Sequence, residues 1–339
     1  MIAIIALLIG ILLPALGKAR SSAQAIVAAA NARAVGQGVA IYTGGNKSFF
    51  PPAYVYGAEE TGLRWFEEEQ QTSNPEPING YVHWSQALFD GEDTAGEAFE
   101  NPALANGGAP RTNPGPDEDN WEPGQINDLN QNAGNATNLP QDRQLARVGF
   151  AGNGAIFPRN KFLSSPGQRL NRLVKESEIQ IGSNTILLAE LYDGNGTWRS
   201  LSDSVGENTG DFVIKSHRPI TPFAGRGEGS GDAVYSVPSF PAGTAAAREP
   251  RFVYPSLDPL DGEFIEKDED KGEGSMLNRG IDMVGQPHSG KGNFCFVDGH
   301  VSRLTNRETI EQRLWGDRFY SLTGTGTGVR KEPRNNGNP

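Results

Sequence analysis

The residues best suited to chemistry lie near the end of the chain, where His288 is followed, nine residues later, by Asp298-Gly299 and then by His300. An imidazole and a carboxylate can exchange a proton, bind a metal ion or fix a turn by hydrogen bonding. We favour a structural role, in which His288 packs on or hydrogen-bonds a strand hairpin and Asp298 holds its turn. The alternative is a metal or ligand site made from the same three side chains. A zinc or iron site would need all three in a defined geometry.

The hairpin is predicted from residues 293–304, "NFCFVDGHVSRL", where two runs of strand-forming residues flank Asp298-Gly299. An Asp-Gly pair favours a two-residue type I′ turn. Strand alternation places Phe294 and Phe296 on one face and Cys295 on the other. Cys295 is the only cysteine, which excludes an intramolecular disulfide and a thiolate zinc site. We expect it to be a buried small hydrophobic residue and not a nucleophile.

Two other stretches resemble ion or nucleotide sites. The loop "KDEDKGEGS" offers Asp268, Asp270 and Glu273 to Ca²⁺ but lacks EF-hand spacing, so we interpret it as a solvated charge run. Residues 285–292, "GQPHSGKG", match G-x-x-x-x-G-K, but Gly292 stands where a phosphate-binding loop needs Ser or Thr, and a strand follows in place of a helix. We therefore expect no nucleotide, and Ca²⁺ is the only cofactor with a candidate site.

Composition and charge narrow the function classes further. The 339 residues include 30 Lys and Arg against 41 Asp and Glu, a formal net charge of -11. A phosphate backbone would be repelled, so nucleic acid is not an expected partner. The 43 Gly and 23 Pro predict a core wrapped in long loops. No G-x-S-x-G, H-E-x-x-H or C-x-x-C motif is present, and we predict no enzyme.

The chain begins "MIAIIALLIGILLPALGKAR", in which residues 2–16 carry no polar side chain. As a helix this run covers roughly 22 Å, less than the ~30 Å of bilayer hydrocarbon, and a proline near its end would kink it. A secretory signal would need basic residues before the run, and none is present. We predict a membrane or assembly helix whose characteristic residues are Ile2, Ile5, Leu8, Ile9, Leu12 and Pro14.

Residues 18–42 are predicted to continue this helix as an amphipathic half. Apolar residues at spacings of three, four or seven form a narrow stripe, which we expect to be buried: Ala19, Ala23, Ile26, Val27, Ala30, Ala34 and Ile41. Gly44-Gly45 and Pro51-Pro52 should end the helix. The two halves would then form one continuous rod.

Short elements in loop-rich sequence follow the rod. We predict an amphipathic segment at 80–89, order resuming at 147–162, strands within 184–194 and 211–223, and a short helix at 306–316. The domains are residues 1–45 as the helix, 46–316 as a globular domain with an irregular insertion at 90–145, and 317–339 as a disordered tail. The fold class is α+β, with the long helix packed on an antiparallel β-sheet.

The segment "IIALLIGILLPALGKAR" resembles the start of type IV pilin-like proteins and type II secretion pseudopilins. The pairing of His288 with Asp298-Gly299 matches an H-X9-DG motif, and "NGGAPRTNP" and "KSHRPITPF" extend the likeness. Together they make the chain similar to the planctomycete DUF1559 family. This resemblance implies a pilin-like fold and a prepilin-type start. The family's Gly-Phe junction and glutamate are missing here, which suggests a misplaced or truncated start at Met1.

The resemblance also implies a lost disulfide. Relatives carry one cysteine late in the first helix and another in a downstream Cys-Pro pair. The matching positions here are Ala28 and Asn101. Without that link, the insertion would be the more mobile region.

The function that the resemblance implies is that of a non-enzymatic pilin-like or pseudopilin-like protein of the bacterial cell envelope. Its apolar half-helix would anchor in the inner membrane or pack against other pilin-like subunits, with Gly10, Ala15 and Gly17 permitting close approach. The globular domain would lie on the periplasmic or external side. One alternative is a membrane-tethered module that binds a polysaccharide or surface partner without forming a filament. A hydrolase using His288 and Asp298 is less favoured.

Overall fold

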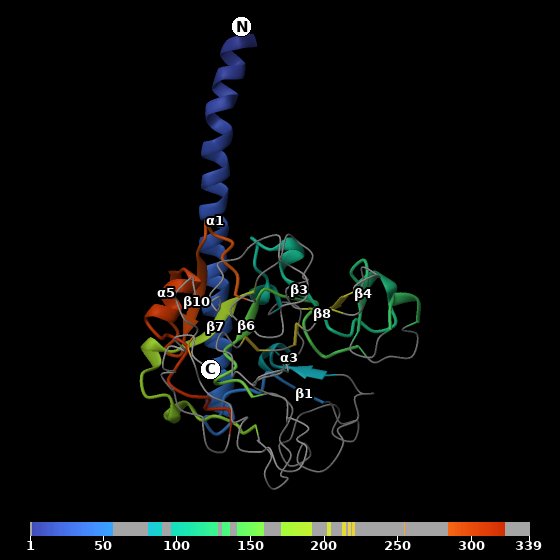
Figure 1. Cartoon of the computed structure of the whole chain (residues 1–339), viewed down its shortest axis with the longest axis vertical. Coiled ribbons are helices and arrows are strands. Elements are labelled where there is room, and N and C mark those ends of the chain that lie inside the picture. Colours follow the sequence, from blue (N-terminus) through green and yellow to red (C-terminus); the bar gives the residue numbers. More distant parts are fainter. Residues whose placement is uncertain are drawn as a thin grey trace, which may run out of the picture.

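One helix, α1 (Ile2–Gly45), projects from a globular part built of short strands (Figure 1). The computed structural model describes residues 2–56, 81–89, 96–127, 131–135, 141–158, 171–191, 202–204, 212–214, 216–217, 219–220, 254 and 284–322. The helix is unbroken over 44 residues and includes Pro14. It ends at Gly45, as predicted. The continuous rod expected from the sequence is therefore confirmed.

The main sheet has four antiparallel strands in the order β11-β10-β7-β6. Its strands are β6 (Phe150–Gly152), β7 (Ile186–Glu190), β10 (Gly292–Phe296) and β11 (Val301–Leu304). The second half of α1 packs across this sheet and contacts β7, β10 and β11. The strand predicted within 184–194 and the hairpin around Asp298 are both present. The predicted α+β class, with a long helix on an antiparallel sheet, is confirmed.

Both faces of β10 are buried, and the alternation along the strand explains how. Asn293 and Cys295 face α1, since Asn293 reaches the carbonyl oxygen of Ala25 and the Cys295 sulfur lies against Gly36. Phe294 points the other way and meets Trp315 edge-on, with ring centroids 6.1 Å apart. The sheet therefore lies between α1 on one face and the C-terminal segment on the other.

The remaining elements are short and surround this core. Two smaller sheets pair β1 (Tyr54–Tyr56) with β2 (Tyr81–His83) and β3 (Ala109–Pro110) with β5 (Arg147–Val148). A third contains β4 (Gln125–Ile126), β9 (Phe212–Ile214) and β8 (Ser202–Ser204), with β4 parallel to β9. The short helices are α3 (Trp84–Phe89), α5 (Asn306–Glu311), η3 (Glu97–Phe99), η4 (Ala105–Gly107), η5 (Glu118–Asn120), η6 (Ala133–Asn135), η7 (Glu176–Glu178) and η8 (Gly182–Asn184).

The predicted face of the amphipathic half of α1 is wrong. Ile26, Val27 and Ile41 are 64%, 49% and 78% exposed. The buried stripe consists instead of Ala25, Ala28, Ala32, Val35 and Val39. The sheet comes so close that a methyl group on Gly36 would lie 2.6 Å from the Cys295 sulfur. Only small residues fit beneath the helix there, and the larger isoleucines lie outside.

The predicted disordered tail also begins too early. Phe319, Tyr320 and Leu322 are at most 4% exposed, and the amide of Ser321 donates to the carbonyl oxygen of Ala155. The globular domain therefore includes residues 317–322. Residues 323–339 of the predicted tail lie outside the described residues.

The close crossing of α1 and β10 makes a testable prediction about Gly36. The Gly36→Ala variant should lose about 1–3 kcal/mol of unfolding free energy, because the added methyl group overpacks a filled space. The Cys295→Ala variant should lose about 1 kcal/mol by leaving a small cavity. The double variant should lose clearly less than the sum of these values, since one change makes room for the other.

Urea unfolding of the full chain in detergent micelles measures these free energies. Gly17→Ala is the matched control, because a methyl group at that position would meet nothing within 4 Å apart from its chain neighbours and the backbone of its own helix. Strictly additive losses in the double variant would contradict the crossing.

Candidate functional site

Three buried polar side chains form a cluster between the main sheet and α1. Glu190, His288 and Asn293 are 0%, 4% and 1% exposed. The His288 Nε2 atom lies 3.0 Å from Glu190 Oε1, and the Asn293 side-chain amide donates to the same oxygen at 2.8 Å. The backbone N–H of Asn293 donates to Glu190 Oε2 at 2.8 Å. The buried carboxyl group of Glu190 is thus hydrogen-bonded at both oxygens, as buried polar groups require. We call this set the Glu190 clamp.

Local structure explains how His288 reaches the clamp. His288 and Lys291 exchange backbone hydrogen bonds of 3.0 and 3.3 Å across a tight turn. The two residues between them, Ser289 and Gly290, have φ angles of 57° and 79°. Two left-handed residues in succession define a type I′ turn. The turn type expected at Asp298-Gly299 is therefore found nine residues earlier, where it positions the imidazole.

The clamp also ties the helix to the sheet. The Asn293 side-chain amide donates a second hydrogen bond, of 3.1 Å, to the carbonyl oxygen of Ala25 in α1. The backbone carbonyl of Glu190 accepts from the N–H of Gly285 at 2.7 Å. His288 was expected to pack on or hydrogen-bond the hairpin. Its ring instead pairs with a glutamate of β7, the neighbouring strand.

Asp298 lies at the far end of β10 and shapes the hairpin loop. The predicted two-residue turn is wrong: the N–H of Phe296 donates to the carbonyl of His300, and only Gly299 has a positive φ, of 85°. This is a three-residue loop, a type I turn followed by a left-handed glycine. Asp298 Oδ1 lies 3.1 Å from the His300 N–H and 2.6 Å from His300 Nδ1. Partial burial would raise the pKa of Asp298, but these hydrogen bonds outweigh burial and lower it.

The trio considered for a metal is split between the two ends of β10. His288 precedes the strand, while Asp298 and His300 follow it, and five strand residues at about 3.3 Å each separate the two ends by roughly 17 Å. Within the described residues, no group of three His, Cys, Asp or Glu side chains is arranged to hold a metal ion. The calcium candidates Asp268, Asp270 and Glu273 lie outside the described residues.

Two other buried groups are held in their neutral forms. Burial raises the pKa of the Cys295 thiol to about 12, so it remains a thiol at neutral pH. Burial lowers the pKa of His83 to about 3. The Nδ1 atom of His83 accepts a 3.2 Å hydrogen bond from the N–H of Ser85, which suits a neutral imidazole. Neither group is poised for nucleophilic chemistry.

The two internal segments that extend the family resemblance meet in space. Thr112, of "NGGAPRTNP", places its hydroxyl oxygen 2.5 Å from Nδ1 of His217, of "KSHRPITPF". Tyr81 stacks on the His217 ring at 4.4 Å between centroids, and Tyr54 meets it edge-on at 4.2 Å. Both Thr112 and His217 are at most 1% exposed. This second cluster joins four chain segments and has a packing role.

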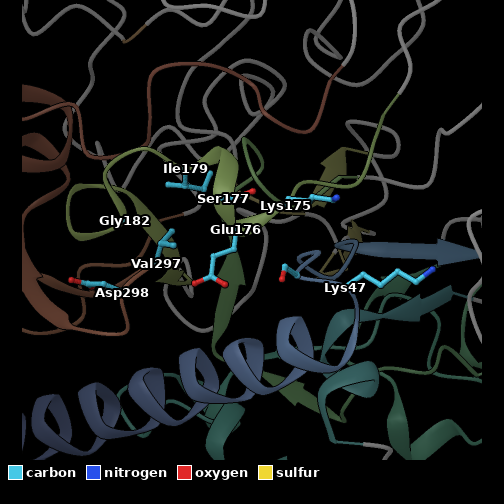
Figure 2. Close-up of a pocket in the computed structure, with 9 residues that line it drawn as sticks. Lys47, Lys175, Glu176, Ser177, Ile179, Gly182, Val297 and Asp298 are labelled. Carbon is cyan, nitrogen blue, oxygen red and sulfur yellow. The ribbon is translucent and has the colours of Figure 1, made fainter.

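A shallow cavity of about 610 Å³ lies beside the Asp298 loop and the end of α1. It is lined by Lys47, Ser48, Lys175, Glu176, Ser177, Ile179, Gly182, Val297 and Asp298. Figure 2 shows Val297 and Asp298 at one end and Lys47 at the other, with Glu176 between them. The cavity therefore presents carboxylates and ammonium groups together on an exposed surface.

Sequence reasoning identified His288 but missed its partners. Glu190 is the last residue of the otherwise apolar strand "ILLAE". A carboxyl group at the end of a buried strand was the sequence feature that could have identified it as a partner of His288. Asn293 was part of the predicted hairpin strand, but its contacts to α1 and Glu190 depend on tertiary structure. The chain matches no family model, no curated protein and no solved structure.

The clamp predicts unequal effects of substitutions within the motif. Glu190→Ala leaves three buried donor groups without an acceptor and should cost about 3 kcal/mol or more of unfolding free energy. His288→Ala should cost about 1–3 kcal/mol, because it removes one hydrogen bond and opens a cavity. Asp298→Ala changes an exposed turn and should cost less than about 1 kcal/mol.

Denaturant unfolding of the full chain in micelles compares the three variants under one condition. A loss of unfolding free energy as large for Asp298→Ala as for His288→Ala would contradict the separate roles of the two residues, since they would then act as one unit.

Proposed function

We propose that this chain is a non-enzymatic, pilin-like protein of the cell envelope, held in a membrane by the apolar half of α1. The observation that carries the proposal is the exposure of that half. Between Ile4 and Leu16, the large apolar side chains that the structure describes are 50–67% exposed and point in every direction around the helix. The most apolar 18-residue window of α1 has a mean hydropathy of 1.7 and no buried residue. By length and composition, α1 can cross a membrane.

The energetics favour lipid over water for this segment. Fully burying a leucine or isoleucine side chain is worth roughly 1.5–3 kcal/mol. The apolar half carries eight such residues with described exposure: Ile4, Ile5, Leu8, Ile9, Ile11, Leu12, Leu13 and Leu16. Hydrocarbon accepts them on all faces, and the helix pairs its backbone groups internally, apart from the N–H groups of its first turn and the carbonyl of Gly10 opposite Pro14.

The charged residues that follow fit the same arrangement. Lys18 and Arg20 come within one turn of Leu16 and are exposed. Long basic side chains can extend to the headgroup layer while their stems remain in lipid. The globular domain then lies beside the membrane on one side. In the proposal this is the periplasmic or external side of the inner membrane.

Hydrolase activity at His288 and Asp298 is the less favoured interpretation of the H-X9-DG motif. Catalysis by His288 and Asp298 would require the two side chains to face one substrate. His288 is instead 4% exposed and paired with Glu190, at the opposite end of β10 from Asp298.

A membrane-tethered binding module is the second candidate function. The 610 Å³ cavity at the Asp298 loop favours it, because a surface hollow with both acids and lysines could hold a polar partner such as a polysaccharide or a surface protein. In that case the helix would serve as an anchor only, and copies would remain monomeric in the membrane.

Membrane partitioning tests the anchor. Leu12→Lys places a charge inside the apolar half at a cost of about 3 kcal/mol, which should shift the membrane-to-soluble ratio by about 100-fold. Ile41→Lys is the matched control. It changes a residue that is 78% exposed but lies in the half packed on the sheet, so the ratio should stay unchanged.

Carbonate extraction of membranes from cells that express the full chain measures both ratios. A wild-type chain found mainly in the soluble fraction would overturn the proposed anchoring.

A further inference from the structure

The outward face of α1 carries an apolar stripe that no described residue covers. Its members are spaced alternately by four and three residues: Ile5, Ile9, Leu12, Leu16, Ala19, Ala23, Ile26 and Ala30. The five isoleucines and leucines among them are 50–67% exposed, and the three alanines are exposed as well. We call this set the outer seam.

An alternating four-three spacing is the heptad repeat of a left-handed coiled coil. The outer seam fills eight successive core positions, which is four heptads, and three to four heptads are enough to indicate a coiled coil. Beyond Leu16 the seam differs from the rest of the helix surface in polarity. Every polar residue from Lys18 to Asn31 lies off the seam. If the outer seam contacted only water, a large apolar residue such as Ile26 would not be expected on it.

In the apolar half, large side chains lie on every side of the helix. Ile5, Ile9, Leu12 and Leu16 continue the line of the seam through this half. Coiled-coil cores take large branched side chains at these positions. The seam thus continues from the lipid-facing half into the half packed on the sheet without a change of register.

The outer seam lies directly opposite the sheet. At about 100° per residue, its mean direction is roughly 170° from that of the buried stripe, Ala25 to Val39. A helix docked on the seam would therefore not displace the globular domain of its own chain. Two chains joined there would carry their globular domains on opposite sides, which suits domains in a chain of formal charge -11.

The seam ends after Ala30 and is not interrupted by Pro14. The next two core positions after Ala30 are Arg33 and Gln37, so the apolar line stops there. Pro14 occupies the outermost position of the heptad, facing away from a partner. Its ring therefore crowds the carbonyl of Gly10 on the side of the helix away from the seam and does not interrupt the core.

We propose that the outer seam binds the α1 helix of a second copy of this chain, in a parallel two-stranded coiled coil. The proposal rests on the membrane anchoring described above, because anchoring in one bilayer forces two copies to run in the same direction. A parallel pair related by a two-fold axis brings each seam residue against its own counterpart. Ala19 and Ala23, just beyond the apolar half, allow the closest approach there.

Single-cysteine cross-linking of the full chain in native membranes tests the seam. Replacing Cys295 by alanine gives a cysteine-free background. Cysteines are then placed on the seam at Ala19, Ala23, Ile26 and Ala30, and off it at Lys18 and Gly17. Mild oxidation should yield at least about tenfold more dimer at the seam positions, because facing core positions bring Cβ atoms near the ~4 Å that a disulfide needs.

A second pair of variants tests the seam by changing a residue other than the one that carries the cysteine. In a chain with a cysteine at Ala23, Ile26→Lys should abolish most of the cross-linking while the protein stays in the membrane fraction. Ile41→Lys, beyond the end of the seam, should leave cross-linking unchanged.

The outcomes separate this proposal from the anchoring on which it rests. Membrane-bound protein that cross-links best at Gly17, or equally at all positions, overturns the seam and leaves the anchor intact. Membrane-bound monomers also overturn the seam and favour the tethered module. Soluble protein that still cross-links at the seam supports the seam and overturns the anchor.

Discussion

The crossing of α1 over β10 is the contact on which the rest of the structure depends. Gly36 lies against Cys295, and Asn293 reaches out of the Glu190 clamp to the backbone of Ala25. Close approach requires small side chains beneath the helix, and a buried carboxylate requires fixed donors around it. Both conditions hold one half of the rod in a single orientation. Because α1 is unbroken, that orientation also sets the direction in which its apolar half leaves the globular domain (Figure 1).

Most features of α1 were predictable from sequence patterns, but its buried face was not. Its extent, its end at Gly45 and its division into an apolar and an amphipathic half were all predictable from hydropathy and glycine signals. The buried face was not, because alanines occur on both sides and the larger Ile26 was expected to point inward. The usual rule that large apolar residues are buried fails here, since the sheet lies too close to admit them. Their exposure is then the clue to a second partner.

In the H-X9-DG motif, too, the local pattern was predictable from the sequence and the long-range contact was not. The spacing of His288 and Asp298 was visible in the sequence, and so was the hairpin between β10 and β11. The partner of His288 was not, because Glu190 lies 98 residues away and is brought near only by the pairing of β7 with β10. The turn type was misassigned for a local reason. Asp298 keeps a negative φ and uses its carboxylate to hold His300, which leaves only Gly299 in the left-handed region.

In this protein the globular part fixes the orientation of α1. The exposed residues of α1 are those proposed to contact a membrane and another helix. The central claim is that α1 is one rigid rod from its apolar half to Gly45. Amide hydrogen exchange of the full chain in lipid nanodiscs measures this most directly, since a helix break exposes backbone N–H groups to exchange. The account predicts slow exchange without interruption from Leu16 through Val39. Rapid exchange between Leu16 and Ala25 would contradict it, because the two halves would then move independently.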